Sequence, residues 1–86
     1  MISKSDILGM CDLELDEIDA IAEHEHIPEV AAAALGDYLL HQRHGAERVR
    51  DMIVDDIRAA VDRHDEPHAA SLLMALRHFL VAHPCA

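Results

Sequence analysis

Residues 23 to 29 read Glu-His-Glu-His-Ile-Pro-Glu and alternate carboxylate and imidazole side chains. Both groups can bind transition metals, and imidazole also exchanges protons near neutral pH. Glu23 and His26 have the Glu-x-x-His spacing of di-iron carboxylate bundles, but such bundles need a second pair and two further glutamates. The sequence supplies one pair, and the same stretch is more typical of a solvated helix end than of a metal site.

Four polar residues occupy positions where the helical pattern predicts apolar ones, and one of them, His83, extends the apolar stripe of the last helix. Glu25 lies four residues after Ile21 on an apolar stripe, Asp56 interrupts the stripe of the helix expected over 46–63, and His64 extends that stripe. A buried carboxylate must be paired, hydrogen-bonded or bound to a metal, because an uncompensated one costs several kcal/mol. The partners that the sequence offers to these carboxylates are Arg48, Arg50 and Arg77.

A further line of potential ligands, Asp37, His41 and His44, has the spacing i, i+4, i+7 on one helix. Mixed carboxylate and imidazole ligands suit iron, manganese or zinc. If the helices converge, the predicted metal ligands are Glu25, His26, Asp37, His41, Asp56 and His64. The identity of the metal does not follow from the pattern.

The sequence offers little for covalent or nucleotide chemistry. The serines lie outside any Gly-x-Ser-x-Gly elbow, and Cys11 precedes Asp12 in an acidic segment, which disfavours a thiolate. Three glycines cannot form a phosphate-binding loop. We therefore predict no catalytic activity.

The net charge of −10 is unevenly placed. Residues 1–42 hold ten acids against Lys4 alone, whereas residues 43–86 hold seven acids and six arginines. An acidic half repels phosphate groups, so we expect neither nucleic acid nor a membrane surface as a partner. Cys11 and Cys85 lack the spacing of a disulfide framework, and no apolar run is long enough to span a membrane. These features predict a cytoplasmic protein.

The composition predicts an all-α fold. The chain is 51% hydrophobic but 2% aromatic, and alanine and leucine supply most of its apolar residues. Its β-branched residues never alternate as those of a half-buried strand do. At 86 residues, the chain has the length of a single domain over 1–86.

Helix signals divide the chain into a small bundle of four main helices and a short N-terminal one. The short helix is expected over 5–11, and the main ones over about 14–26, 28–43, 46–63 and from 67 onward. Glu14 and Glu17 are spaced for a capping box, and Gly45 is expected to end the third helix in a left-handed conformation. The helix over 28–43 is apolar almost all round and is predicted to be central. The last two helices should form an antiparallel hairpin.

The leading functional hypothesis is a small acidic interaction or regulatory module that binds a second copy or another protein. In this hypothesis the acidic half of one copy faces the arginine-bearing half of another. The alternative is a metal-binding helical protein that uses the six ligands named above. A third hypothesis is a pH-responsive switch, since eight histidines titrate near neutrality. No motif is specific enough to indicate a family.

Overall fold

The computed structural model describes residues 13–84 and residue 86, and these form four helices. They are α2 (Leu15–Glu25), α3 (Glu29–Leu40), α4 (Gly45–Asp62) and α5 (Glu66–Ala82). The all-α prediction is confirmed, and the part of the chain that is described contains no strand. The short helix expected over 5–11 lies outside the described residues. None of the described helices is long and apolar enough to cross a membrane.

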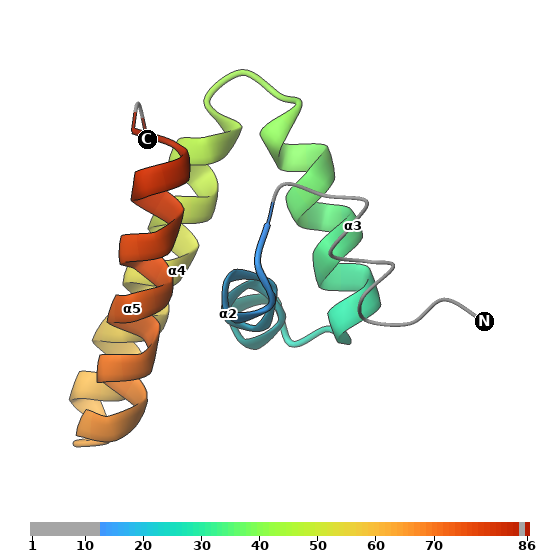
Figure 1. Ribbon diagram of the computed structural model, residues 1–86. Coiled ribbons are helices and arrows are strands. Elements are labelled where there is room, and N and C mark those ends of the chain that lie inside the picture. The colour runs from blue at the N-terminus through green and yellow to red at the C-terminus, as the bar shows by residue number, and fades with distance from the viewer. Residues whose placement is uncertain (1–12, 85) are drawn as a thin grey trace.

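Helices α4 and α5 lie side by side and run in opposite directions, which confirms the predicted hairpin (Figure 1). Two features explain where α5 begins. The Asp65 side chain accepts a hydrogen bond from the backbone N–H of His68 at 3.3 Å, and a proline follows in the first turn, where its missing N–H is not needed.

The predicted capping box begins α2. The Glu17 side chain accepts a hydrogen bond from the backbone N–H of Glu14 at 3.3 Å, and Glu14 is the N-cap residue. Leu13 and Ile18, which flank this box, are both 1% exposed and belong to the hydrophobic core. The box and the buried pair together fix the angle at which the chain enters α2.

A histidine in the left-handed conformation stands in each of the three turns between the described helices. His26, His44 and His64 have φ angles of 55°, 60° and 59°. The prediction that Gly45 adopts this conformation is wrong, because His44 does so instead and Gly45 is the first residue of α4. A Cβ atom on Gly45 would collide with the backbone carbonyl of Leu39, so close chain packing is the reason for this glycine.

Helix α2 is the central one, with α3 on one side and the α4–α5 hairpin on the other (Figure 1). The prediction that α3 is central is wrong: Val30 and Tyr38 on α3 are 62% and 60% exposed. Only one side of α3 is buried, and it consists of Ala32, Ala33, Gly36 and Leu39. The small residues bring α3 close to α2, since Gly36 packs against the side chains of Leu13 and Ile21.

Candidate functional site

Two buried side-chain atoms in the described residues have no hydrogen-bond partner: Oδ2 of Asp56 on α4 and Nε2 of His83 at the end of α5. Asp56 is 4% exposed, and its Oδ2 atom is buried without a hydrogen-bond partner. The prediction that Asp56 lies in the apolar stripe of its helix is therefore confirmed. An unpartnered carboxylate is costly in a protein interior, which makes Asp56 the natural centre of a candidate site.

Four titratable side chains from three helices have charges that act on the pKa of Asp56. The Oε1 atom of Glu23 on α2 lies 2.5 Å from Nε2 of His68 on α5. Nε2 of His24 on α2 lies 3.2 Å from Oδ2 of Asp55 on α4, and its Nδ1 lies 2.9 Å from Oε2 of the adjacent Glu25. We call Glu23, His24, Asp55, Asp56 and His68 the Asp56 cluster.

The charges of the cluster act on one another. Burial raises the pKa of Asp56 to about 7, and the negative charge of Glu23 adds to this rise, while His24 and His68 oppose it. Burial lowers the pKa of His24, but its bonds to Glu25 and Asp55 outweigh that effect and raise the pKa above the usual value. Within this cluster the carboxylates and the histidines therefore act in opposite directions on the pKa of Asp56.

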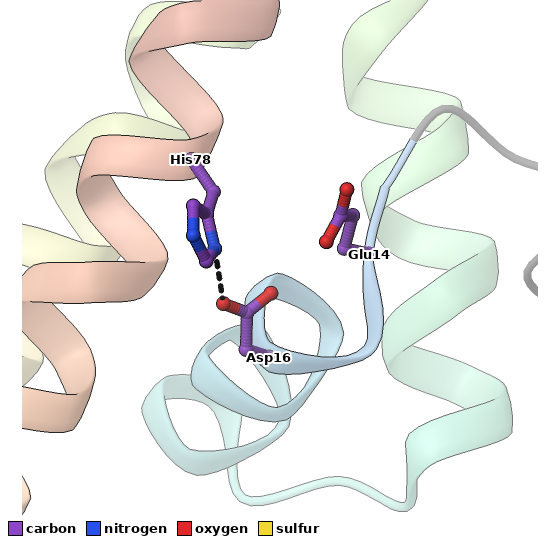
Figure 2. Close-up of side chains that lie close together, drawn as sticks. All are labelled: Glu14, Asp16 and His78. Atoms are coloured by element: carbon purple, nitrogen blue, oxygen red, sulfur yellow. Dashed lines mark hydrogen bonds and ion pairs between the residues drawn. The ribbon is translucent and has the colours of Figure 1, made fainter.

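A second group lies at the start of α2. Glu14, Asp16 and His78 of α5 present potential metal-ligand atoms that all lie within 4.8 Å of one another (Figure 2). Asp16 already uses both of its oxygens. Its Oδ1 accepts the backbone N–H of Glu17 at 2.9 Å, and its Oδ2 lies 2.9 Å from Nδ1 of His78. Glu14 and His78 are exposed, so we call this the helix-start group and regard it as an ion pair beside a helix cap.

Glu17, next to this group, is 1% exposed and was not predicted to be buried. Burial raises its pKa to about 7; the hydrogen bond from the Glu14 backbone opposes the rise, and the charge of Asp16 adds to it. The hydrogen bond to Asp16 raises the pKa of His78. The described residues therefore contain two buried carboxyl groups, Glu17 and Asp56, and burial raises the pKa of each to about 7.

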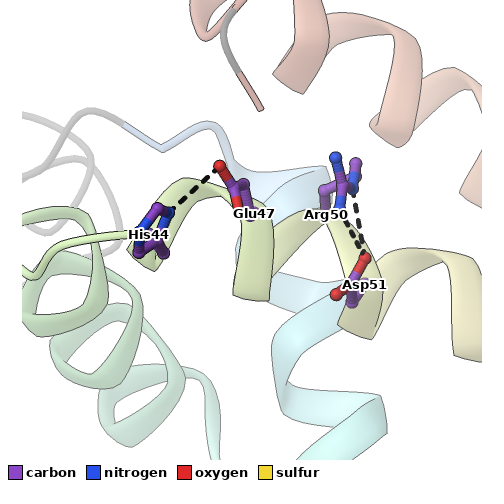
Figure 3. A network of polar contacts seen from close by, with 4 residues as sticks. All are labelled: His44, Glu47, Arg50 and Asp51. Carbon is purple, nitrogen blue, oxygen red and sulfur yellow. Dashed lines mark hydrogen bonds and ion pairs between the residues drawn. The ribbon is translucent and has the colours of Figure 1, made fainter.

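Arginines do not neutralise the buried carboxylate. Arg50, one of the predicted partners, donates from Nε and Nη2 to Oδ1 of Asp51 at 3.1 and 3.0 Å (Figure 3). In the same view His44 pairs with Glu47 at 3.3 Å. Arg48 and Arg77 are exposed, and Asp56 Oδ2 has no partner at all. The prediction of an arginine partner for Asp56 is therefore wrong.

The structure does not gather the six predicted metal ligands into one place. Asp37 and His41 approach each other at 3.8 Å, one turn apart on the exposed side of α3 and its C-cap. Asp56 is buried on α4, whereas Glu25, His26 and His64 are exposed. Glu25 is the last residue of α2, and the backbone at His64 turns away from the axis of α4, so neither continues its stripe into the core. Metal binding by these six residues stays a prediction.

The sequence does not predict which residues have charges that act on Asp56. Glu23 was singled out only for its spacing to His26, and the contacts that matter join residues 31 and 45 positions apart. One signal was available for Glu17, which lies four residues before the buried Ile21 on the same side of α2.

Comparisons with known proteins add no relative: no family model, no curated protein and no solved structure matches this chain. The class of this protein is therefore defined by its fold together with the Asp56 cluster and the helix-start group. The protein is a small all-helical domain with buried carboxyl groups at helix contacts.

Proposed function

We propose that this protein is a small helical interaction module that forms a homodimer through the outer face of α5. One observation carries the proposal: Leu73 and Val81 on that face are 57% and 78% exposed. They border a shallow, open groove of about 460 Å³, lined by Leu73, Met74, Leu76, Arg77, Leu80 and Val81. Exposed apolar surface of this kind favours association with another protein surface.

The distribution of charge favours a second copy as the partner. Every one of the seventeen acids lies at or before Glu66, so the sequence of α5 beyond that residue contains no carboxylate side chain. Two copies with a net charge of −10 each repel one another across most of their surfaces. The outer face of α5 is where two copies can approach with the least repulsion while burying apolar side chains.

The size of the chain supports the same conclusion. A domain of this length buries only about 60–65% of the surface that its unfolded chain exposes. Several large apolar side chains stay exposed in the single copy, among them Leu73, Met74 and Val81 on one helix. Covering them in a dimer adds apolar burial at roughly 25 cal/mol per Å².

The dimer is tested by placing a charge in the proposed interface. We expect Leu73→Glu to convert the protein from dimer to monomer in sedimentation velocity, because the new carboxylate would be buried at the interface. Val30→Glu on α3 is the matched control, since Val30 is 62% exposed and lies outside the α5 groove. It should leave the dimer intact, and circular dichroism should show both variants to be folded.

Salt dependence separates this dimer from one held by the acidic and arginine-bearing halves of the chain. An apolar interface should strengthen between about 0.05 M and about 0.5 M salt, because the salt screens the repulsion between two acidic copies. An interface of opposite charges should weaken over the same range. A wild-type protein that is monomeric throughout, or a Leu73→Glu variant that dimerises as well as Val30→Glu, would refute the proposal.

A further inference from the structure

Two histidines of α5 connect that helix to the central helix α2. Nδ1 of His78 lies 2.9 Å from Oδ2 of Asp16, and Nε2 of His68 lies 2.5 Å from Oε1 of Glu23. Asp16 stands in the first turn of α2 and Glu23 in its last turn. The two contacts therefore join α2 to α5 at two separate places, one at each end of α2.

The chemistry of both contacts depends on pH. An imidazole gains or loses its charge near neutral pH, whereas an ordinary carboxylate stays negative from about pH 5 upward. Each contact is therefore an ion pair while the histidine is protonated and a hydrogen bond without net attraction once the histidine is neutral. An arginine in the same place would keep its charge over this whole range.

We propose that the contact between α2 and α5 is a pH-sensitive device, which holds the two helices together most strongly in mild acid and weakens above neutral pH. It carries the protein beyond the dimer proposed above, since none of its four side chains lines the α5 groove. Because α2 is the central helix, a weaker contact between α2 and α5 lowers the stability of the whole domain.

Carboxylates at the start of α2 favour a charged His78. The hydrogen bond to Asp16 is the main cause that raises the pKa of His78; burial opposes it, and the charges of Glu14 and Glu17 add to the rise. A histidine of this kind stabilises the folded state fully below its ordinary pKa of 6.5. That contribution is lost as the pH rises through the higher pKa of the folded protein.

His68 faces acidic groups from the other elements. Glu23 of α2 contacts its ring, and Asp65 in the turn before α5 accepts a hydrogen bond from its backbone N–H. The charge of His68 also lowers the pKa of Asp56 on α4. Each of these groups is negative when ionised, so a protonated His68 attracts them and a neutral His68 does not.

The buried Glu17 acts in the same direction. It is 1% exposed, burial raises its pKa to about 7, and the positive charge of His78 opposes that rise. As the pH increases, His78 loses a positive charge while Glu17 gains a negative one in the interior. Both changes weaken the same end of the contact between α2 and α5.

The test is a pair of double-mutant cycles on the full chain, measured by urea unfolding at about pH 5.5 and about pH 8.5. One cycle combines His78→Gln with Asp16→Asn, and the other combines His68→Gln with Glu23→Gln. For each pair we expect a coupling of about two- to fivefold in the unfolding equilibrium constant at the lower pH and almost none at the higher pH.

The cycles isolate the two contacts from the other titrating groups. Glu17 and Asp56 also make stability depend on pH, but both are present in all four proteins of each cycle, so their contribution cancels. The same cycles in the Leu73→Glu background should give the same couplings whether or not the wild type dimerises. Failure of the dimer is thereby distinguished from failure of this proposal.

His44→Gln is the matched control. His44 contacts the carboxylate of Glu47 at 3.3 Å within the start of α4, so it titrates without joining two helices. We expect His44→Gln to keep the wild-type difference in unfolding midpoint between the two pH values. The double variant His68→Gln/His78→Gln should lose part of that difference.

Three results would overturn the proposal. They are couplings of equal size at the two pH values, no coupling at the lower pH for either pair, and a His44→Gln variant that loses as much pH dependence as the double variant. If a variant of His68 or Glu23 fails to fold, the cycle on Asp16 and His78 decides the matter. Those two side chains are 37% and 46% exposed, so their replacement disturbs no core packing.

Discussion

The carboxylate of Glu23 on α2 lies 2.5 Å from Nε2 of His68 on α5, although 45 residues separate them in the chain. This contact joins the central helix directly to the last one. Because both side chains are about one-third exposed, the pair contributes only modestly, about 0.5–1 kcal/mol.

We expect His68→Ala to lower the free energy of unfolding by that amount, as measured by urea denaturation. His44→Ala is the control, because His44 pairs with Glu47, which lies three residues further along the chain in the first turn of α4. Its loss should cost less than His68→Ala, since the pair connects no separate elements. Equal effects would show that the contact between α2 and α5 adds nothing to stability.

Glu17 should make the protein more stable in mild acid. Its pKa is about 7 in the folded protein and 4.5 as the ordinary value, so the folded state binds the proton more tightly. The free energy of unfolding should therefore rise as the pH falls from about 8 to about 5, with Glu17 contributing roughly 2–3 kcal/mol.

Glu17→Gln should be more stable than the wild type at about pH 8 and nearly equal to it at about pH 5. Some dependence on pH should remain in this variant, because the pKa of Asp56 is raised in the same direction. Glu66→Gln, an exposed position in the first turn of α5, should keep the wild-type profile. A profile for Glu17→Gln that parallels the wild type would contradict the role of Glu17.

The left-handed histidines in the turns should be replaceable by glycine with a gain in stability. His26 and His64 have φ angles of 55° and 59°, a conformation that costs a residue with a Cβ atom about 1–2 kcal/mol. We expect His26→Gly and His64→Gly each to raise stability by about 0.5–1 kcal/mol in thermal unfolding.

His41→Gly is the control for these two variants, because His41 caps a helix at a φ of −89°, which any residue adopts. Glycine there should lower stability, since it adds freedom to the unfolded chain and removes the contact of His41 Nδ1 with the Asp37 carbonyl oxygen at 2.7 Å. A gain at His41 equal to that at His64 would show that backbone conformation is not the cause.

The two buried glycines among the described residues should differ in how well they tolerate replacement by alanine. A Cβ atom on Gly45 would meet the backbone carbonyl of Leu39, whereas one on Gly36 would meet the flexible ends of the Leu13 and Ile21 side chains. Gly36→Ala should therefore cost about 1–3 kcal/mol, partly offset by the better helix propensity of alanine. Gly45→Ala should cost clearly more, and a smaller loss at Gly45 than at Gly36 would contradict the observed packing.

Much of the fold could be predicted from the sequence because its signals are local. The proline at residue 28 and the Asp65 cap mark helix starts, and the capping box at Glu14 and Glu17 forms as its spacing predicts. The central position of α2 could not be predicted. The apolar character of α3 comes mainly from alanines, which a single neighbouring helix can cover, so its other side stays exposed.

The candidate site could be predicted only in part. Asp56 was found because an acid interrupts an apolar stripe, which is a local pattern. Its neighbours could not be found, because Glu23 meets His68 and His24 meets Asp55 only once three helices have packed. The apolar stripe of α2 reaches Glu25 and therefore predicts burial there. The helix ends at this residue, so the prediction fails.

The mass of the protein in solution tests the proposed function most directly. Sedimentation equilibrium over a range of concentrations should give a species of twice the 9.5 kDa chain mass, and it should persist as salt is raised from about 0.05 M to about 0.5 M. A mass of 9.5 kDa at every concentration and salt level would contradict self-association through α5.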